Sequence, residues 1–478
     1  MKTAFYSRYI IIALICSLLG AGIVIQMVRI NYTPFAQDLI AKSEDYQGVR
    51  KTIYPPRGTI YDRKGNILAT NQIGYEVGID LKNVTDPDSI AFAASTLLEE
   101  LDYLDVFALA STEKRAEENR YYVLSSFVSK EKVEELELLK ENYANRRLET
   151  KSIKPSLSGL VWSPMQQRVY PEGTLGANVL GFYNYFSREN AQGVFGVEEA
   201  YNRLLTGKPQ TVFLPNDPYL VEALPDIEPG ASLVLTIDRD IQYMLEETLE
   251  QALAWSGGEG GTIIVADPKT GEILGMASTP FFNPNQYWKY QETFPGITPY
   301  NRAVGTAYEP GSVFKVITMA AALDSGAVDL DTTYNDTSGV YWVANSWPIY
   351  NWNYGAWGVQ DMTGCMQHSL NVCLAHVAID LLGEDLFYEY LQAFGFGRST
   401  GIDLASEANF PLRLPENNQW MSLDLATNSF GQGIAVTPIQ MVAAISAIAN
   451  DGKMMTPHVV RSVVDNGQQY NVSPQVIN

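Results

Sequence analysis

Two short patterns in the second half of the chain carry side chains that could form and break an acyl bond. The first is a Ser-x-x-Lys pattern, Ser312 to Lys315, which directly follows a Pro-Gly turn. A lysine three residues after a serine lies on nearly the same face of a helix. From Val316 to Leu323 nearly every residue is apolar, which predicts a helix buried on all sides. We therefore expect burial to lower the pKa of Lys315, so that its neutral amine accepts the proton of a nucleophilic Ser312.

The Ser-x-x-Lys pattern also has a simpler interpretation. A chain of this length holds about one such pattern by chance at ordinary composition. A second copy, Ser129 to Lys132, lies in a polar helical stretch where its lysine stays charged. At Ser312, the serine could cap a helix while the lysine extends along the surface into water. Spacing alone leaves both interpretations open.

The second pattern is Ser369-Leu370-Asn371, the one Ser-x-Asn in the sequence. A helix that ends near His368 and another that begins near Val372 would place it on the loop between them. There a hydroxyl could relay a proton between Lys315 and a leaving amine, and the amide could hold a peptide carbonyl. The alternatives are an ordinary helix cap and a Ser-His pair that uses His368 but lacks a third partner.

Composition argues against several other classes of protein. The 478 residues carry a net charge of −21, which disfavours nucleic-acid binding because phosphate contacts require clustered Lys and Arg. Hydrophobic residues make up 46%, enough for a folded core, and the length favours two or three domains. Three Cys and three His are too few for a disulfide scaffold or a four-thiolate zinc site, so we expect no metal and no cofactor. We expect Cys365 and Cys373 to be free and packed rather than paired.

An uncharged segment near the N-terminus predicts a membrane anchor. Residues 10–28 carry no charged side chain and are just long enough to cross a bilayer as a helix. Lys2 and Arg8 precede this segment, which favours a cytoplasmic tail at 1–9 and an extracytoplasmic position for the residues after the segment, including the catalytic part. We expect a single-pass helix in the cytoplasmic membrane. The alternative is a cleaved signal peptide, which the length and the lack of a small-x-small cleavage site disfavour.

The remaining sequence predicts an α+β fold in two parts, joined by a linker at 224–232. Residues 30–223 alternate short strands with charged helical stretches, one of which begins at Asp86. Residues 233–478 begin with a sheet and continue mainly as helices. The first elements expected there are a strand at 233–238, a helix at 240–254 and the two strands of a hairpin at 261–266 and 272–278.

The motifs, taken together and in this order, resemble the penicilloyl serine transferases, whose signatures are Ser-x-x-Lys, Ser-x-Asn and Lys-Thr/Ser-Gly. More closely, the chain resembles a class B penicillin-binding protein, a monofunctional peptidoglycan D,D-transpeptidase. The resemblance covers almost the whole chain. Besides the N-terminal apolar segment, it rests on 57–63 (RGTIYDR), 193–198 (GVFGVE), 267–273 (DPKTGEI), 308–315 (YEPGSVFK), 369–371 (SLN) and 429–433 (SFGQG).

The resemblance implies a role for each candidate residue. Ser312 would attack the penultimate D-Ala carbonyl of a stem peptide, with Lys315 as base, Ser369 as proton shuttle and Asn371 as substrate-binding group. The acyl-enzyme would pass to an amine on a neighbouring stem, and β-lactams would acylate Ser312 as substrate mimics. Residues 30–223 would form a pedestal, or dimerisation, domain that contacts the lipid-linked-glycan polymerase and other cell-wall machinery. Residues 233–478 would form the transpeptidase domain.

One family signature has no match at its expected place. No Lys-Thr/Ser-Gly follows Asn371, and Lys269-Thr270-Gly271 precedes Ser312 in a segment whose pattern predicts a hairpin turn. We therefore expect a transpeptidase domain that lacks its last strands and is labelled poorly by fluorescent penicillin. The alternatives are a non-catalytic cell-wall scaffold and a β-lactam sensor or β-lactamase on the same fold. The lifetime of an acyl complex would separate these three functions.

Weaker features predict structure rather than chemistry. Gly431-Gln432-Gly433 predicts a close approach of backbone near the site. The aromatic residues from Trp342 to Trp357 are expected to pack under a long loop rather than to bind a glycan or a peptide. We expect Arg57 and Asp62 to form an ion pair, and Glu198 and Glu199 to lie at the surface or to make contacts within the pedestal.

Overall fold

The structure, a computed structural model, describes residues 2–32, 48–98, 101–111, 121–145, 155–185, 191–215, 227–296, 298–344 and 347–478. Contacts divide the chain into two compact units. The first comprises Met1–Pro56 and Gly207–Pro229, and the second comprises Arg57–Thr206 and Gly230–Asn478. Residues 224–226 of the predicted linker lie outside the described residues.

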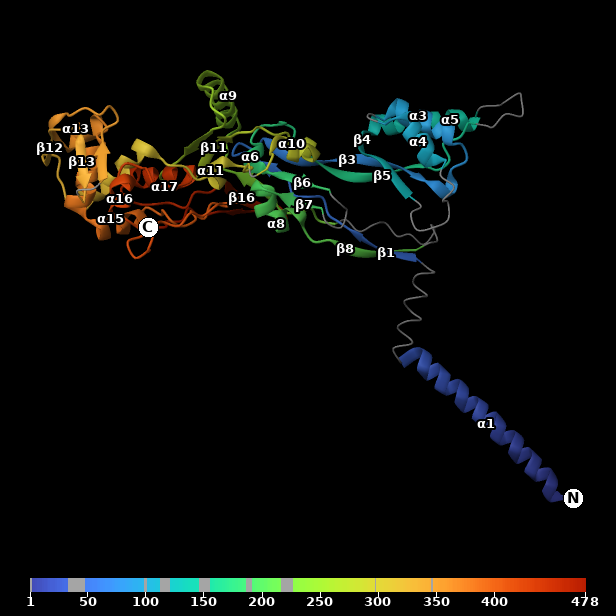
Figure 1. Cartoon of the computed structure of the whole chain (residues 1–478). Coiled ribbons are helices and arrows are strands. Elements are labelled where there is room, and N and C mark those ends of the chain that lie inside the picture. Colours follow the sequence, from blue (N-terminus) through green and yellow to red (C-terminus); the bar gives the residue numbers. More distant parts are fainter. Residues whose placement is uncertain are drawn as a thin grey trace. The chain divides into compact units, whose positions relative to one another are not determined.

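The first unit contains one long helix and one pair of strands (Figure 1). Helix α1 (Lys2–Tyr32) includes the whole of the uncharged segment 10–28. Strand β1 (Gly48–Ile53) pairs antiparallel with β8 (Gln210–Pro215). Within the part of the chain that the structure describes, none of the helices combines the length and the apolar character that crossing a membrane requires.

The second unit is built on a seven-stranded sheet in the order β17-β16-β9-β2-β3-β4, with β5 also paired to β3. Strand β2 runs parallel to β9, and the other neighbours are antiparallel. The sheet therefore contains strands from both sides of the predicted linker. Its strands are β2 (Ile60–Tyr61), β3 (Ile67–Asp80), β4 (Tyr121–Val128), β5 (Leu160–Val169), β9 (Ser232–Leu235), β16 (Val460–Asp465) and β17 (Gln468–Asn471).

Three helices pack with β3, β4 and β5 around a separate apolar core. They are α3 (Pro87–Leu97), α4 (Tyr103–Ala110) and α5 (Lys130–Asn145). The carboxylate of Asp86 accepts a hydrogen bond from the backbone N–H of Ser89 and caps α3, as the Asp-Pro-Asp-Ser sequence predicts. Shorter elements complete this region and the start of the next: η1 (Leu81–Asn83), α6 (Ala177–Leu180), β6 (Phe182–Asn184), β7 (Gln192–Val194), α7 (Gly196–Ala200) and α8 (Asn202–Thr206).

The predicted hairpin forms after helix α9 (Arg239–Ser256). Strand β10 (Thr262–Ala266) pairs antiparallel with β11 (Ile273–Ser278). The turn between them contains Lys269-Thr270-Gly271, and Gly271 adopts a φ of +80° that favours glycine. This triplet therefore lies in a turn, as predicted. Three short helices follow: η3 (Pro284–Lys289), α10 (Tyr290–Thr293) and α11 (Arg302–Gly305).

The last region is mainly helical and positions both sequence patterns. Two small sheets pair β12 (Thr333–Asp336) with β15 (Gly358–Asp361) and β13 (Val340–Val343) with β14 (Trp347–Tyr350). The helices are η4 (Gly311–Phe314), α12 (Lys315–Asp324), α13 (Met362–Gln367), α14 (Asn371–His376), η5 (Val377–Leu382), α15 (Glu384–Ala393), α16 (Ser422–Asn428) and α17 (Pro438–Ala449). The expectation that α12 is buried on all sides is wrong, because Val316 and Leu323, two turns apart on one face, are each 38% exposed.

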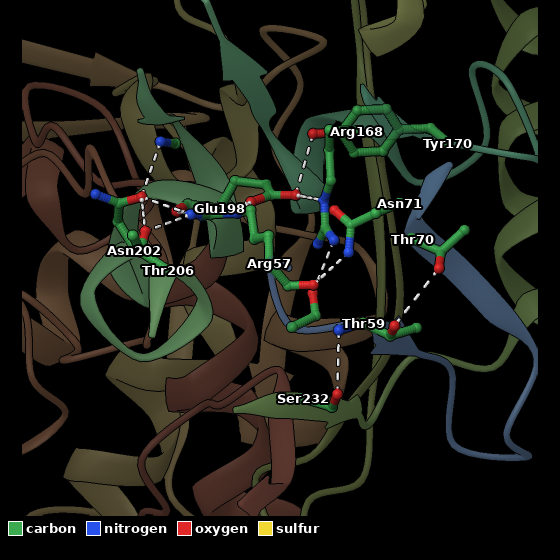
Figure 2. Close-up of polar contacts among 12 residues, drawn as sticks. Arg57, Thr59, Thr70, Asn71, Arg168, Tyr170, Glu198, Asn202, Thr206 and Ser232 are labelled. Atoms are coloured by element: carbon green, nitrogen blue, oxygen red, sulfur yellow. Dashed lines mark hydrogen bonds and ion pairs between the residues drawn. The ribbon is translucent and has the colours of Figure 1, made fainter. Parts of the chain in front are cut away.

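A buried cluster of charges connects segments far apart in the sequence (Figure 2). Glu198 is fully buried, and its two carboxylate oxygens accept bonds from Arg57 Nε at 2.7 Å and Arg168 Nε at 2.8 Å. The Tyr170 hydroxyl donates to the same carboxylate at 3.1 Å. Burial alone would raise the pKa of Glu198, but the two guanidinium groups outweigh it and hold that pKa below its ordinary value.

This cluster corrects one expectation and decides between the two given for Glu198. Glu198 does not lie at the surface but makes contacts within residues 30–223, and Arg57 pairs with Glu198 rather than with Asp62. The carboxylate of Asp62 instead accepts from the backbone N–H groups of Lys64 and Asn66, each at 2.8 Å. An aspartate at the start of a tight turn satisfies such N–H groups locally, so Asp62 is used within its own turn.

Candidate active site

A turn at Pro310-Gly311 leads directly into the first pattern. Gly311 has a φ of +60°, and the chain then forms the short helix η4, which continues into α12. Ser312 lies on η4 with its side chain exposed, whereas Lys315, at the start of α12, is only 1% exposed. The sequence thus places a serine at the surface and a lysine in the interior one turn later.

The amine of Lys315 is bound by three oxygen atoms, none of which carries a charge. Its Nζ donates to the backbone carbonyl of Ser369 at 2.6 Å, to the hydroxyl of Ser369 at 3.0 Å and to Oδ1 of Asn371 at 2.8 Å. Burial lowers the pKa of Lys315 to about 8, as expected from the sequence. At neutral pH, about one tenth of the amine is therefore in the neutral form that can accept a proton.

The second pattern lies on the predicted loop between two helices. Helix α13 ends at Gln367, Ser369 adopts a φ of +53°, and α14 begins at Asn371. A left-handed conformation is uncommon for serine, and here it reverses the chain so that both the carbonyl and the hydroxyl of Ser369 reach Lys315. The amide of Asn371 donates to the backbone carbonyl of Tyr350 at 3.0 Å, which connects this loop to strand β14.

The same loop is closed by a disulfide, which the sequence analysis did not expect. Cys365 on α13 and Cys373 on α14 are bonded, with their Cα atoms 6.0 Å apart. The expectation of free cysteines is wrong because the chain reverses at Ser369 and brings the two helices side by side. Eight residues of continuous helix would have separated the two thiols beyond the range of a disulfide.

The Ser429–Gly433 segment supports the turn before Ser312. The N–H of Gly311 donates to the carbonyl of Gly431 at 2.9 Å, and the N–H of Gly433 donates to the carboxylate of Glu309 at 2.7 Å. Gly431 has a φ of +80°, and a Cβ there would lie 2.2 Å from the Gly311 carbonyl oxygen. The predicted close approach of backbone is confirmed, and only glycine fits at Gly431.

One expected contact is not present in the structure. Among the described residues, the hydroxyl of Ser312 forms no hydrogen bond, to Lys315 or to any other group. Hydrogen bonds of a nucleophile are often long without substrate and shorten when it binds, so this geometry does not exclude proton transfer. His368 stacks on the ring of Trp357, with centroids 4.2 Å apart, which does not favour a Ser-His pair.

The aromatic residues beside the second pattern are mostly exposed, so the expectation that they pack under a loop is wrong for five of them. These residues are Trp342, Trp347, Tyr350, Trp352 and Tyr354. The contact between the Tyr350 carbonyl and Asn371 could not be predicted, because a backbone group has no signature in the sequence.

Within the described ranges, no group of three or more His, Cys, Asp or Glu side chains is arranged to hold a metal ion.

Comparison with known proteins matches two family models and several relatives to this chain. Residues 52–216 match the penicillin-binding protein dimerisation domain, and residues 261–478 match the penicillin-binding protein transpeptidase domain. The chain is 31% identical to stage V sporulation protein D of Bacillus subtilis, covering 95% of this chain and 67% of that protein. It is 28% identical to the peptidoglycan D,D-transpeptidase MrdA of Acinetobacter baumannii, covering 90% and 65% respectively.

A solved structure resembles the fold as well. The crystal structure of penicillin-binding protein 2X from Streptococcus thermophilus matches 90% of this chain with a TM-score of 0.69 and 23% identity. The match covers 64% of that protein. The chain therefore spans about two thirds of the length of the relatives to which it is similar.

Proposed function

This chain belongs to the class B penicillin-binding proteins, and we propose that it acts as a serine D,D-transpeptidase that cross-links peptidoglycan. One observation carries the proposal. The buried amine of Lys315, one helical turn after the exposed Ser312, is held by three uncharged oxygen atoms and has a lowered pKa. A carboxylate partner would have kept this amine protonated and unable to act as a base.

The proposed reaction follows from these contacts. The neutral amine of Lys315 accepts the proton of Ser312, whose Oγ attacks the penultimate D-Ala carbonyl of a stem peptide. The Ser369 hydroxyl, 3.0 Å from Lys315 Nζ, returns the proton to the departing amine as the bond between the two D-Ala residues breaks. Asn371 positions the stem peptide. An amine of a second stem then attacks the ester, which frees Ser312 and forms the cross-link.

A β-lactam tests the nucleophile directly. Mass spectrometry of the protein after long incubation with penicillin is expected to find a slowly formed adduct on Ser312 that persists for hours. Ser312→Ala should abolish the adduct, and Ser129→Ala, in the second Ser-x-x-Lys pattern, should leave it unchanged. An adduct that disappears within seconds would favour a β-lactamase. No adduct on Ser312 would overturn the proposal and favour a non-catalytic scaffold.

The membrane anchor is also part of the proposal. We propose that residues 10–28 hold the chain in the cytoplasmic membrane, with 1–9 inside and the transpeptidase domain outside. The described part of α1 exposes a run of large apolar side chains: Leu14, Ile15, Leu18, Leu19, Ile23, Val24, Ile25, Met27 and Val28. Such a surface is costly in water. The test is whether alkaline carbonate extracts the full chain from membranes; ready extraction would contradict a spanning helix.

Residues 30–223 are proposed to act as the pedestal, and 233–478 as the transpeptidase domain. The match of 52–216 to the dimerisation domain supports this division. The proposed partners of the pedestal are the lipid-linked-glycan polymerase and other cell-wall proteins. Cross-linking in cells, followed by identification of proteins bound to 30–223, would test this role, and failure to recover the polymerase would count against it.

A further inference from the structure

An uncharged aromatic surface lies next to the Ser369 loop, outside the residues that the proposed reaction uses. From Thr337 to Gln360 the chain contains four tryptophans and three tyrosines but no Asp, Glu, Lys, Arg or His. Four of these side chains are exposed and define the surface, here called the aromatic face: Trp342 (55%), Tyr350 (42%), Trp352 (66%) and Tyr354 (75%).

The hairpin register and one ring contact relate three of these rings, those of Trp342, Tyr350 and Tyr354, and Trp352 is exposed in the turn between the two tyrosines. Trp342 is paired with Pro348 and Val340 with Tyr350, so Trp342 and Tyr350 lie on the same face of the β13–β14 hairpin. The rings of Tyr350 and Tyr354 are 5.3 Å apart. Tyr354 has a φ of +57°, a conformation that a bulky residue adopts only where its surroundings hold it.

The aromatic face is continuous with the proposed active site. The backbone carbonyl of Tyr350 accepts the amide of Asn371 at 3.0 Å, and the side-chain oxygen of Asn351 accepts the N–H of Val372 at 3.3 Å. The turn that carries these rings is therefore bonded directly to the loop whose Asn371 also binds Lys315. Contiguous exposed apolar side chains, unlike scattered single ones, mark interaction or ligand-binding surfaces.

We propose that the aromatic face binds the glycan strand to which the stem peptide is attached, an inference that rests on the proposed function. N-acetylglucosamine is uncharged, and the lactyl carboxyl of N-acetylmuramic acid is uncharged wherever it forms the amide bond to a stem peptide; both sugars present C–H faces that pack against aromatic rings. Asn353 is exposed between Trp352 and Tyr354; its Oδ1 accepts from the N–H of Gly355 at 3.0 Å, and its Nδ2 is a donor of the kind that binds sugar hydroxyls. A stem peptide carries carboxylates, for which this surface has no cation. A protein partner would be expected to meet Arg and a charged rim as well as aromatic rings.

Glycan strands without stem peptides test this proposal separately from catalysis. Strands freed of peptide by an amidase, with the exposed lactyl carboxylates converted to methylamides and one end labelled, are titrated with the full chain, and binding is followed by fluorescence anisotropy. The native protein is expected to bind, and Trp352→Ala, alone or with Tyr354→Ala, to bind about tenfold more weakly. Trp255→Ala is the matched control, because Trp255 is 90% exposed on α9, away from this hairpin.

Each outcome decides the proposal. The proposal would be overturned if the aromatic variants bound strands as tightly as the native protein does, or if the native protein bound no strands. The second result would favour a protein partner as the ligand of the aromatic face. Displacement of the labelled strand by an excess of free stem peptide would overturn it in favour of a peptide site. Penicillin adducts on Ser312 should form equally in the native protein and in Trp352→Ala. If these adducts are absent while strands still bind, the proposed function fails and the glycan surface stands.

Discussion

Placing a carboxylate beside the Lys315 amine tests the central element of the proposed mechanism. The Asn371→Asp substitution puts a negative charge where Oδ1 now accepts from Lys315 Nζ at 2.8 Å. A charge pair at about 4 Å is worth about 4 kcal/mol at the effective dielectric constant near a protein surface. Since about 1.4 kcal/mol corresponds to one pKa unit, this energy corresponds to a rise of about 3 units in the pKa of Lys315; screening by water reduces it, and we expect a rise of at least about 2 units.

The consequence for reactivity follows from the protonation state. With a pKa of about 8, the neutral fraction of Lys315 at pH 7 is about one tenth. A rise of 2 units reduces this fraction about 100-fold, and acylation of Ser312 by penicillin should slow to the same extent. In the native protein, the acylation rate should rise with pH up to about 8 and then level off. An ordinary lysine would instead give a tenfold rise per pH unit up to about 10.

Nuclear magnetic resonance of ¹⁵N-labelled lysine measures the pKa directly, and Lys315→Met identifies the signal. Gln367→Glu is the matched control, because it adds a carboxylate to an exposed side chain at the end of helix α13, directly before the same loop. Its effect on the pKa should be small, since exposed charges are screened by water. A native pKa near the ordinary value of lysine, or an unchanged pKa in Asn371→Asp, would refute the reasoning.

Three further predictions concern contacts that stabilise the fold and the site. Gly431→Ala should slow acylation of Ser312 and lower the free energy of unfolding by about 1–3 kcal/mol. The control is Gly452→Ala, which has a similar φ but no atom near the added Cβ and should therefore show only the cost of the positive φ. Equal losses of unfolding free energy in denaturant titrations of the two variants would exclude a steric clash at Gly431. Glu198→Gln should destabilise the protein by about 3–5 kcal/mol because two buried guanidinium groups lose their counter-charge, while the exposed Glu199→Gln should have little effect. Since the folded pKa of Glu198 lies below its unfolded value, this stabilisation is present above the unfolded pKa and is lost as pH falls through the folded one, so the native protein and Glu198→Gln should converge in acid. Replacing both cysteines of the disulfide by serine should lower the free energy of unfolding by about 2–3 kcal/mol and make it insensitive to reductant, whereas Cys16→Ser should leave that sensitivity intact.

Local patterns predicted the parts of the site that depend on neighbouring residues. A Pro-Gly turn before an apolar run placed Ser312 and Lys315 at the start of a helix, and a break between two helical patterns placed Ser369 on a loop. These features depend on hydrogen bonds within a few residues, which spacing and residue type specify. For the same reason the Asp-Pro-x-x-Gly turn at 267–271 could be predicted.

Contacts between distant residues could not be predicted in this way. Arg57 and Glu198 are separated by 141 positions, and no spacing rule links them. Asp62 is near Arg57 in sequence, and this nearness led to the wrong prediction of an ion pair between Arg57 and Asp62. The disulfide depends on the left-handed conformation of Ser369, which serine adopts seldom enough that its sequence gives no signal. Where a local and a long-range partner compete for a charged group, only the folded backbone decides between them.

The Lys315 site combines local contacts, which the sequence pattern specifies, with contacts between distant residues, which it does not. Burial of the lysine follows from the apolar helix around it, but a buried lysine next to a carboxylate would remain charged, and one without polar partners would be costly to bury. The three uncharged oxygens of Ser369 and Asn371 satisfy the amine without fixing its proton. They come from a loop more than fifty positions away, held by the disulfide below it and by the Tyr350 carbonyl beside it. The reactivity of the serine is therefore set by the placement of that loop as much as by the Ser-x-x-Lys pattern itself.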